Sequence, residues 1–268
     1  NRVADLLFSK TFYPPRLDEN GVDRGHITVM TGTLSGGEYS NAVTATTCGD
    51  YKSTTNPTDT FVVGGYASAC GAAFTETAEL SCQDEQRIYC MGVDYTATLV
   101  PPKPVQGRYA FTSKDTWRPG EGIASADAQC QSEASAAALP GTYKALLATD
   151  GSSAASRFAT TTDSLPWIRT DGIRLSATAA GFFTTALLDL VPNRSADGNT
   201  FVGGPIGWSG AATMTAAGTP ATTCLNWLSG ELANAGHAGD LSVTGTAGFF
   251  GGLQMPCNAS RFLICLQE

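Results

Sequence analysis

The sequence has few of the residues from which enzyme active sites and metal centres are usually built. It contains only two histidines, His26 and His237, too few for the usual Cys/His metal clusters. No two cysteines are spaced as Cys-x-x-Cys, the spacing typical of zinc and thiol-redox motifs. A nucleophile elbow is also missing, because "GWSGA" (207–211) departs from Gly-x-Ser-x-Gly at its last position. We therefore expect no enzyme activity, no catalytic residue and no cofactor.

Positive charge and long apolar runs are scarce as well. The 16 Lys and Arg are outnumbered by 24 Asp and Glu, which gives a net charge of −8 and disfavours a nucleic-acid surface. The most apolar segment, "SATAAGFFTTALLDL" (176–190), is too short and too rich in Thr and Ala for a membrane span. Residues 1–20 carry charges and prolines where a signal peptide would be apolar. We expect no nucleic-acid partner and no membrane insertion.

What the chain does have is an even set of eight cysteines and 30 glycines. Cysteines without zinc or redox spacing are most simply explained by disulfides, which form in oxidising compartments. The abundance of glycine and turn signals favours short strands and loops over a helix bundle. The composition predicts a secreted protein or one displayed on the extracellular surface.

An internal repeat relates the two halves of the chain. "TTCGDY" (46–51) matches "TTCLNW" (222–227), and "CQDEQRIYC" (82–90) matches "CNASRFLIC" (257–265). Both matches have an offset of about 175 positions, and such self-similarity at one period indicates repeated structural units.

The repeat also predicts where the domains lie. Residues 107–268 hold one complete unit, and it follows a Pro-rich linker, "VPPKPVQ" (100–106), that we expect to be stiff and extended. Residues 1–99 match only the second half of that unit. They are either the C-terminal half of a first repeat, so that the chain begins inside a domain, or a shorter domain that folds by itself.

The complete unit has readable secondary structure. Residues 107–113 alternate as a strand does, and so do residues 261–268. The Ala-rich segment 125–139 predicts a helix that Ser125 caps and whose inner face carries Cys130.

Four motifs of this unit occur in a recognisable order: "ADAQCQSEASAAALPGTYKALLAT", "WSG", "CLNW" and "RFLICLQE". Together they resemble the endostatin-type branch of the C-type lectin-like fold, as found in bacterial exported domains. The resemblance covers nearly all of residues 107–268 and, more weakly, residues 12–93. It implies an α+β protein with tandem C-type lectin-like domains, of which the first is only a C-terminal half. The fold hosts many kinds of binder, so it implies little about the ligand.

The resemblance also implies a disulfide pattern, with a helix cysteine joined to the last strand and a second pair inside. Carried over to this sequence, the pairs are Cys130–Cys265, Cys224–Cys257 and Cys48–Cys82. Two cysteines remain uncertain, Cys70 and Cys90. Cys90 pairs either with a helix outside this sequence or with Cys70, and Cys70 otherwise pairs between chains or stays free.

Two loops collect oxygen-bearing side chains at equivalent places of the repeat, "LDENGVD" (17–23) and "NRSADGN" (193–199). Their candidate calcium ligands are Asp18, Asn20, Asp23, Asn193, Asp197 and Asn199. The same Asn-Gly and Asp-Gly pairs are also plain turn signals. The triplets with which sugar-binding C-type lectins hold calcium are absent, so calcium-dependent sugar binding is not expected.

Candidate ligand-binding residues lie in loops of the second unit. Trp117 stands in the Gly/Pro loop 115–122, where we expect an exposed ring, whereas Trp208 and Trp227 fall at core positions. His237 and Asp240 lie in residues 232–245, which we interpret as a long loop. They either contact a ligand or are ordinary solvated residues.

These observations lead to two hypotheses about function. The first is a non-catalytic recognition or adhesion module that binds a protein or glycan through its loop face. The second is a structural repeat subunit of an extracellular fibre, matrix or appendage, in which an upstream segment or another chain completes the first domain.

Overall fold

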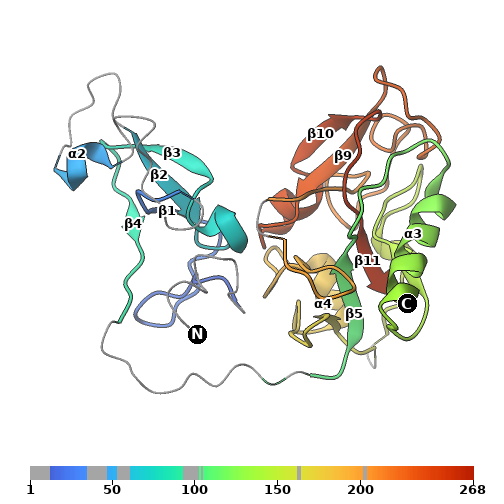
Figure 1. Ribbon diagram of the computed structural model, residues 1–268, viewed down its shortest axis with the longest axis horizontal. Helices are drawn as coiled ribbons and strands as arrows, with labels where there is room; N and C mark the ends of the chain where they lie inside the picture. The colour runs from blue at the N-terminus through green and yellow to red at the C-terminus, as the bar shows by residue number, and fades with distance from the viewer. Residues whose placement is uncertain are drawn as a thin grey trace. The chain divides into compact units, whose positions relative to one another are not determined.

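The computed structural model describes residues 13–34, 47–52, 61–92, 103, 105–161, 164–201 and 204–268. The chain divides into two compact units, unit 1 with residues 1–101 and 202–204, and unit 2 with residues 102–201 and 205–268. The division falls within the predicted linker, most of which lies outside the described residues. Each unit is of mixed α and β structure, with small sheets and few helices (Figure 1).

The described residues of unit 2 form two sheets. The four-stranded sheet has the order β6-β11-β5-β7 and the three-stranded sheet the order β10-β9-β8. Within the first, β5 and β6 each pair antiparallel with β11, and β7 is parallel to β5. The strands are β5 (Arg108–Thr112), β6 (Tyr143–Ala145), β7 (Trp167–Arg169), β8 (Ile206–Trp208), β9 (Ala235–Asp240), β10 (Leu253–Pro256) and β11 (Ile264–Gln267).

The main helix of unit 2, α3 (Ile123–Ala136), packs on the four-stranded sheet. Alanine favours the helix, and the inner face of α3 presents Cys130 to the core, as expected. The predicted N-cap was wrong, because the helix begins after Gly122, which has a φ of 79°. The Ser125 hydroxyl instead lies within the first turn and donates to Gly122 O. Shorter helices are η2 (Ala155–Arg157), α4 (Ala179–Thr184) and η3 (Ala247–Gly251).

Unit 1 contains a single four-stranded sheet among its described residues, with the order β3-β2-β1-β4. Its elements are β1 (Thr28–Met30), α2 (Cys48–Tyr51), β2 (Phe61–Tyr66), η1 (Gly71–Phe74), β3 (Ala78–Ser81) and β4 (Arg87–Ile88). No helix of the described residues in either unit is long and apolar enough to cross a membrane.

The internal repeat is visible in the pairing of the strands. Val29 of β1 lies opposite Gly65 of β2, and the equivalent Gly207 of β8 lies opposite Gly239 of β9. At the repeat offset of about 175 positions, the β2–β3 and β9–β10 pairs have the same register. β4 pairs parallel with β1, and at the equivalent place in unit 2 Phe262 forms a parallel bridge with Gly207 of β8. The two units therefore share one three-stranded sheet and the beginning of a fourth strand.

A close backbone contact recurs in this shared sheet. A Cβ atom on Gly65 would lie 2.0 Å from Phe74 O, and one on Gly239 would lie 2.0 Å from Phe249 O. Real Cβ atoms do not approach so closely, so only glycine fits either position. The sequence repeat thus marks the same backbone geometry in both units.

Both units also contain the same unusual turn. All four residues of α2 have positive φ, from 51° at Cys48 to 63° at Gly49, so this segment is a left-handed turn. Residues 224–227 repeat it, with φ values from 51° at Cys224 to 67° at Trp227. Left-handed residues other than glycine cost about 1–2 kcal/mol each, so each turn needs strong contacts to hold it.

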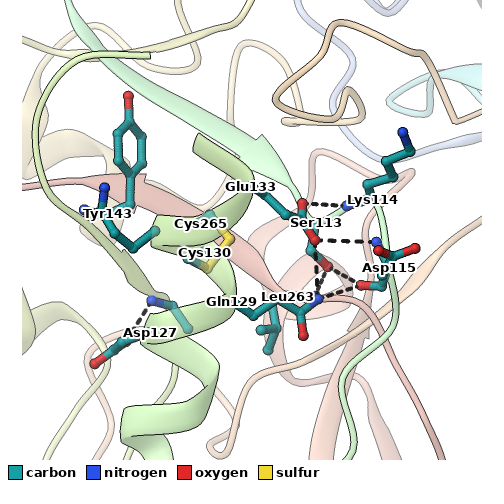
Figure 2. Close-up of a disulfide and its surroundings, with 12 residues drawn as sticks. Ser113, Lys114, Asp115, Asp127, Gln129, Cys130, Glu133, Tyr143, Leu263 and Cys265 are labelled. Carbon is teal, nitrogen blue, oxygen red and sulfur yellow. Dashed lines mark hydrogen bonds between the residues drawn. A yellow bond between two sulfur atoms is a disulfide. The ribbon is translucent and has the colours of Figure 1, made fainter. Parts of the chain in front are cut away.

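Three disulfides are present, Cys48–Cys82, Cys130–Cys265 and Cys224–Cys257. These are the pairs that the resemblance implies. The thiol of Cys90 is free and exposed, so it is not bridged to Cys70, which is buried. Figure 2 shows the bond between Cys130 of α3 and Cys265 of β11, which fastens the helix onto the sheet.

Removing each disulfide of unit 2 should lower the free energy of unfolding according to the length of chain that it closes. Cys130–Cys265 closes 135 residues and Cys224–Cys257 closes 33. By chain entropy, these loops correspond to about 5 and about 4 kcal/mol. Denaturant unfolding of the C130A/C265A and C224A/C257A variants checks the order. A larger loss in the second variant would show that packing at the turn, and not loop closure, decides stability.

Candidate functional site

The loop between β8 and β9 of unit 2 carries three exposed leucines close together in the sequence. We call residues 224–234 the leucine loop. Its leucines Leu225, Leu228 and Leu232 are 47%, 64% and 68% exposed. Large apolar side chains grouped on one exposed segment often mark a site of protein interaction.

The leucine loop is held at both ends. The disulfide to Cys257 fixes Cys224 in the left-handed turn, and Cys257 N donates to Asn234 O at 2.9 Å. Inside the loop, Ser229 N donates to Cys224 O and Asn234 Nδ2 donates to Ser229 Oγ, at 3.0 and 2.8 Å. These bonds join the start, middle and end of the loop, so its leucines stand on a fixed backbone.

The segment that precedes helix α3, residues 118–122, supports the loop from outside. Gly120 N and Gly122 N both donate to Trp227 O, at 2.9 and 3.0 Å. Arg118 contributes a bond from its guanidinium to Gly230 O at 2.7 Å. The loop therefore depends on residues that lie about 110 positions earlier in the chain.

Three tryptophans whose rings are in contact anchor the leucine loop to the core. Trp227 is fully buried, and its Nε1 donates to Ala148 O at 2.8 Å. Its ring makes edge contacts with Trp208 and Trp117, with centroids 5.8 and 5.7 Å apart. Because Trp227 occupies the core, the residues before and after it, Asn226 and Leu228, face solvent.

Trp117 is not the exposed residue that the sequence suggested. Only 7% of its surface is accessible, and its Nε1 donates to Ser125 Oγ at 3.1 Å. The Gly/Pro loop around it looked solvent-facing, but the ring of Trp117 packs against the ring of Trp227, and its backbone pairs with that of Arg261. Trp208 and Trp227 are buried, as expected.

His237 and Asp240 lie in strand β9 and not in a long loop. His237 pairs with Gln254 of β10 in the sheet, and its backbone N donates to Thr222 O at 2.8 Å. Its Nδ1 is buried without a hydrogen-bond partner in the described structure. The Asp240 carboxylate accepts from the Ser242 backbone and hydroxyl, at 2.9 and 2.6 Å. Both residues are half-buried, and neither lies in the leucine loop.

The candidate calcium loop of unit 1 forms a turn closed by its own side chains. Asp18 Oδ1 accepts from Asn20 N and Val22 N, both at 2.9 Å. The bond from Val22 N is the main reason that the pKa of the Asp18 carboxyl is below its usual value, and Arg24 and Asn20 N lower it further. Arg24 binds the other oxygen of Asp18, and Asp23 is paired with Arg16 at 2.8 Å. The side-chain amide of Asn20 donates to Glu19.

The equivalent loop of unit 2 is closed in the same way. Asp197 accepts from the Ser195 hydroxyl and pairs with Lys114 at 3.0 Å, and these bonds lower the pKa of Asp197 to about 2. Asn199 N donates to Ser195 Oγ at 3.2 Å. In the described parts of both units, no group of three or more His, Cys, Asp or Glu could hold a metal. The turn interpretation accounts for the contacts of these residues.

A partly buried ion cluster fixes Asn193. Asn193 Oδ1 accepts from Arg169 at 2.7 Å, and the guanidinium of Arg169 also makes two hydrogen bonds to Asp171, at 3.0 and 2.7 Å. Arg194 binds the same carboxylate at 3.0 Å. Burial alone would raise the pKa of Asp171, but the hydrogen bonds and charges of Arg169 and Arg194 outweigh it and hold the pKa below its usual value.

The exposure of the three leucines was not predicted from the sequence, in which "CLNW" served as a repeat anchor and as one of the four motifs of the resemblance. A signal was available in the comparison of the two repeats. At the same offset, the positions of Leu225 and Leu228 are occupied by Gly49 and Lys52. The shared backbone does not require apolar residues at these two loop positions, because the other copy has a small residue at one and a charged residue at the other.

Replacing Asp171 by alanine should destabilise unit 2, because it leaves the buried guanidinium of Arg169 without its carboxylate. We expect a loss of about 3 kcal/mol in the free energy of unfolding at pH 7. A lowered carboxyl pKa stabilises the fold above the unfolded value of about 4 and ceases to do so as the pH falls through the folded value. The difference between Asp171→Ala and the wild type should therefore narrow below about pH 4.

Denaturant unfolding from pH 7 down to pH 3 measures this difference, with the exposed Glu121→Ala as the matched control. A difference that stays constant over this pH range would show that Asp171 acts by packing and not by charge.

Comparison of the chain with protein-family models and with curated proteins finds no match. The functional proposal therefore depends on the structure of each unit by itself.

Proposed function

We propose that the protein is a secreted or surface-displayed recognition module that binds a protein partner through the leucine loop of unit 2. The observation that carries this proposal is the exposure of Leu225, Leu228 and Leu232 on a backbone that a disulfide and a buried tryptophan hold in place. A preformed loop loses little conformational freedom on binding, so more of the contact energy remains as affinity.

The side chains of the site favour a protein over a glycan as ligand. A sugar ring is usually bound against an exposed aromatic face with polar side chains around it, whereas none of the described aromatic residues of unit 2 is exposed. The leucine loop offers mainly apolar surface, and much of its polar backbone is used internally. Apolar surface of this kind suits the centre of a protein interface.

The localisation and the absence of catalysis are part of the same proposal. Three disulfides fit an oxidising compartment outside the cytosol. The three carboxyl groups with altered pKa described above, Asp18, Asp171 and Asp197, serve turns and ion pairs, and none of them lies in the leucine loop. We accordingly assign the site to binding and not to turnover.

A screen against arrayed extracellular proteins and arrayed glycans tests this proposal. The full chain should bind at least one arrayed protein, and the L228S/L232S variant should bind that protein about tenfold more weakly. Both leucines are exposed, so the variant should unfold at the same temperature as the wild type.

The matched control is Leu165→Ser, which removes a leucine that is 49% exposed elsewhere in unit 2. It should leave binding unchanged. The proposal fails if no protein binds above background, or if the two variants weaken binding equally. Binding to glycans alone, unaffected by the leucine substitutions, would also overturn it.

The second hypothesis, a structural subunit, is supported by a different observation. In the last strand of unit 1, Ile88 is 67% exposed, whereas the equivalent Leu263 of unit 2 is fully buried. Sedimentation over a hundredfold concentration range should reveal regular polymers if the chain assembles with itself. A monomer that persists at every concentration would exclude self-assembly.

A further inference from the structure

Equivalent segments at the end of the two units differ in strand pairing. In unit 2, β11 lies between β5 and β6, and its residues from Ile264 to Leu266 are at most 1% exposed. The equivalent residues of unit 1, 89–92, follow β4 and pair with no strand in the described part of that unit. Unit 2 thus has strands on both sides of a segment that has none among the described residues of unit 1.

The uncovered segment has apolar side chains at the positions that are buried in the other unit. Ile88 is 67% exposed and Met91 is 51% exposed, whereas their counterparts Leu263 and Leu266 are fully buried. A hollow of about 410 Å³, lined in part by Arg87, adjoins the beginning of this segment. An open strand edge with exposed apolar residues is a ready site for the addition of another strand.

The cysteine pattern points to the same partner. Cys90 is free and exposed, and at the repeat offset it corresponds to Cys265, which is bonded to Cys130 of α3. Ile88 and Cys90 occupy the positions of Leu263 and Cys265, both of which belong to the core beneath the helix. The missing partner therefore includes a helix as well as strands.

Unit 2 shows how such a partner would be held. Ser113 N donates to Leu263 O at 2.8 Å, which joins the chain after β5 to the beginning of the last strand (Figure 2). The other side of that strand is closed by Leu146 N, which donates to Ile264 O at 2.8 Å. On α3, the Glu133 carboxylate accepts from Lys114 N at 2.6 Å and so ties the helix to the same chain.

We propose that residues 87–92 are the acceptor site for a strand–helix–strand segment of another polypeptide chain. The donor places one strand on each side of residues 89–92 and a helix over Ile88, and a cysteine on that helix forms a disulfide with Cys90. The proposal does not depend on the leucine loop, because the two surfaces belong to different units.

The disulfide forms by exchange with an oxidised thiol compound. The thiols of Cys90 and of the donor helix each give up one proton and one electron. One sulfur–sulfur bond forms between them, the disulfide of the oxidant breaks, and two reduced thiols are released.

The test uses a synthetic polypeptide with residues 105–148 of this chain, which contain β5, α3, β6 and a single cysteine, Cys130. The full chain is incubated with this peptide in a buffer of reduced and oxidised glutathione. Mass spectrometry should find a one-to-one adduct, and peptide mapping should place its bond at Cys90. A scrambled peptide of the same composition should give about tenfold less adduct.

Two substitutions separate docking from simple thiol chemistry. Ile88→Ser should reduce the adduct toward the scrambled level while Cys90 still reacts with a small disulfide reagent. The matched control, Phe61→Ser, removes an exposed aromatic residue of the same unit and should leave the yield unchanged. A third experiment uses the peptide with Cys130→Ser, which should slow hydrogen exchange of the amides of residues 87–92.

The proposal is overturned if the native and scrambled peptides give equal yields, or if Ile88→Ser and Phe61→Ser behave alike. Disulfide mapping of the protein from its natural source gives an independent result. Cys90 should be joined there to a cysteine of another polypeptide, and a bond within the same polypeptide would overturn the proposal.

Discussion

The disulfide that ties a left-handed turn to the end of a β-strand is the constraint on which both units depend. Cys224 opens the turn and Cys257 follows β10, just as Cys48 opens α2 and Cys82 follows β3. Four consecutive residues at positive φ are unfavourable without such a bond. In unit 2 the turn directs Trp227 into the core and leaves Leu225 outside. The candidate site is thus a direct result of the strained backbone that the disulfide stabilises.

Part of this structure could be predicted from the sequence because it depends on local patterns. The inner face of α3 follows from the spacing of alanine and cysteine in an Ala-rich segment. The repeat itself was recognisable from cysteines and their neighbours, and the strand registers show the same offset. The three disulfides are the pairs expected from the resemblance, and that pattern could not have been deduced from spacing alone.

Other features depend on contacts between distant parts of the chain and gave no local signal. Strand β9 has the sequence "AGHAGD", which lacks the β-branched residues typical of strands. It forms because its glycines allow neighbouring backbone and the Trp208 ring to approach closely. Trp117 is buried by residues more than a hundred positions away. The exposure of the leucines likewise follows from the packing of Trp227 and not from any periodicity.

The contact between a glycine and a carbonyl group, repeated at Gly65 and Gly239, has a consequence for how such a protein can change. A contact made by backbone atoms alone places no demand on the identity of the surrounding side chains. Two copies can therefore keep the same sheet while their surfaces diverge, one towards exposed leucines and the other towards an open strand. The frame of the unit and the specificity of its surface are separable properties, and a new binding preference can arise in one copy without loss of the fold in the other.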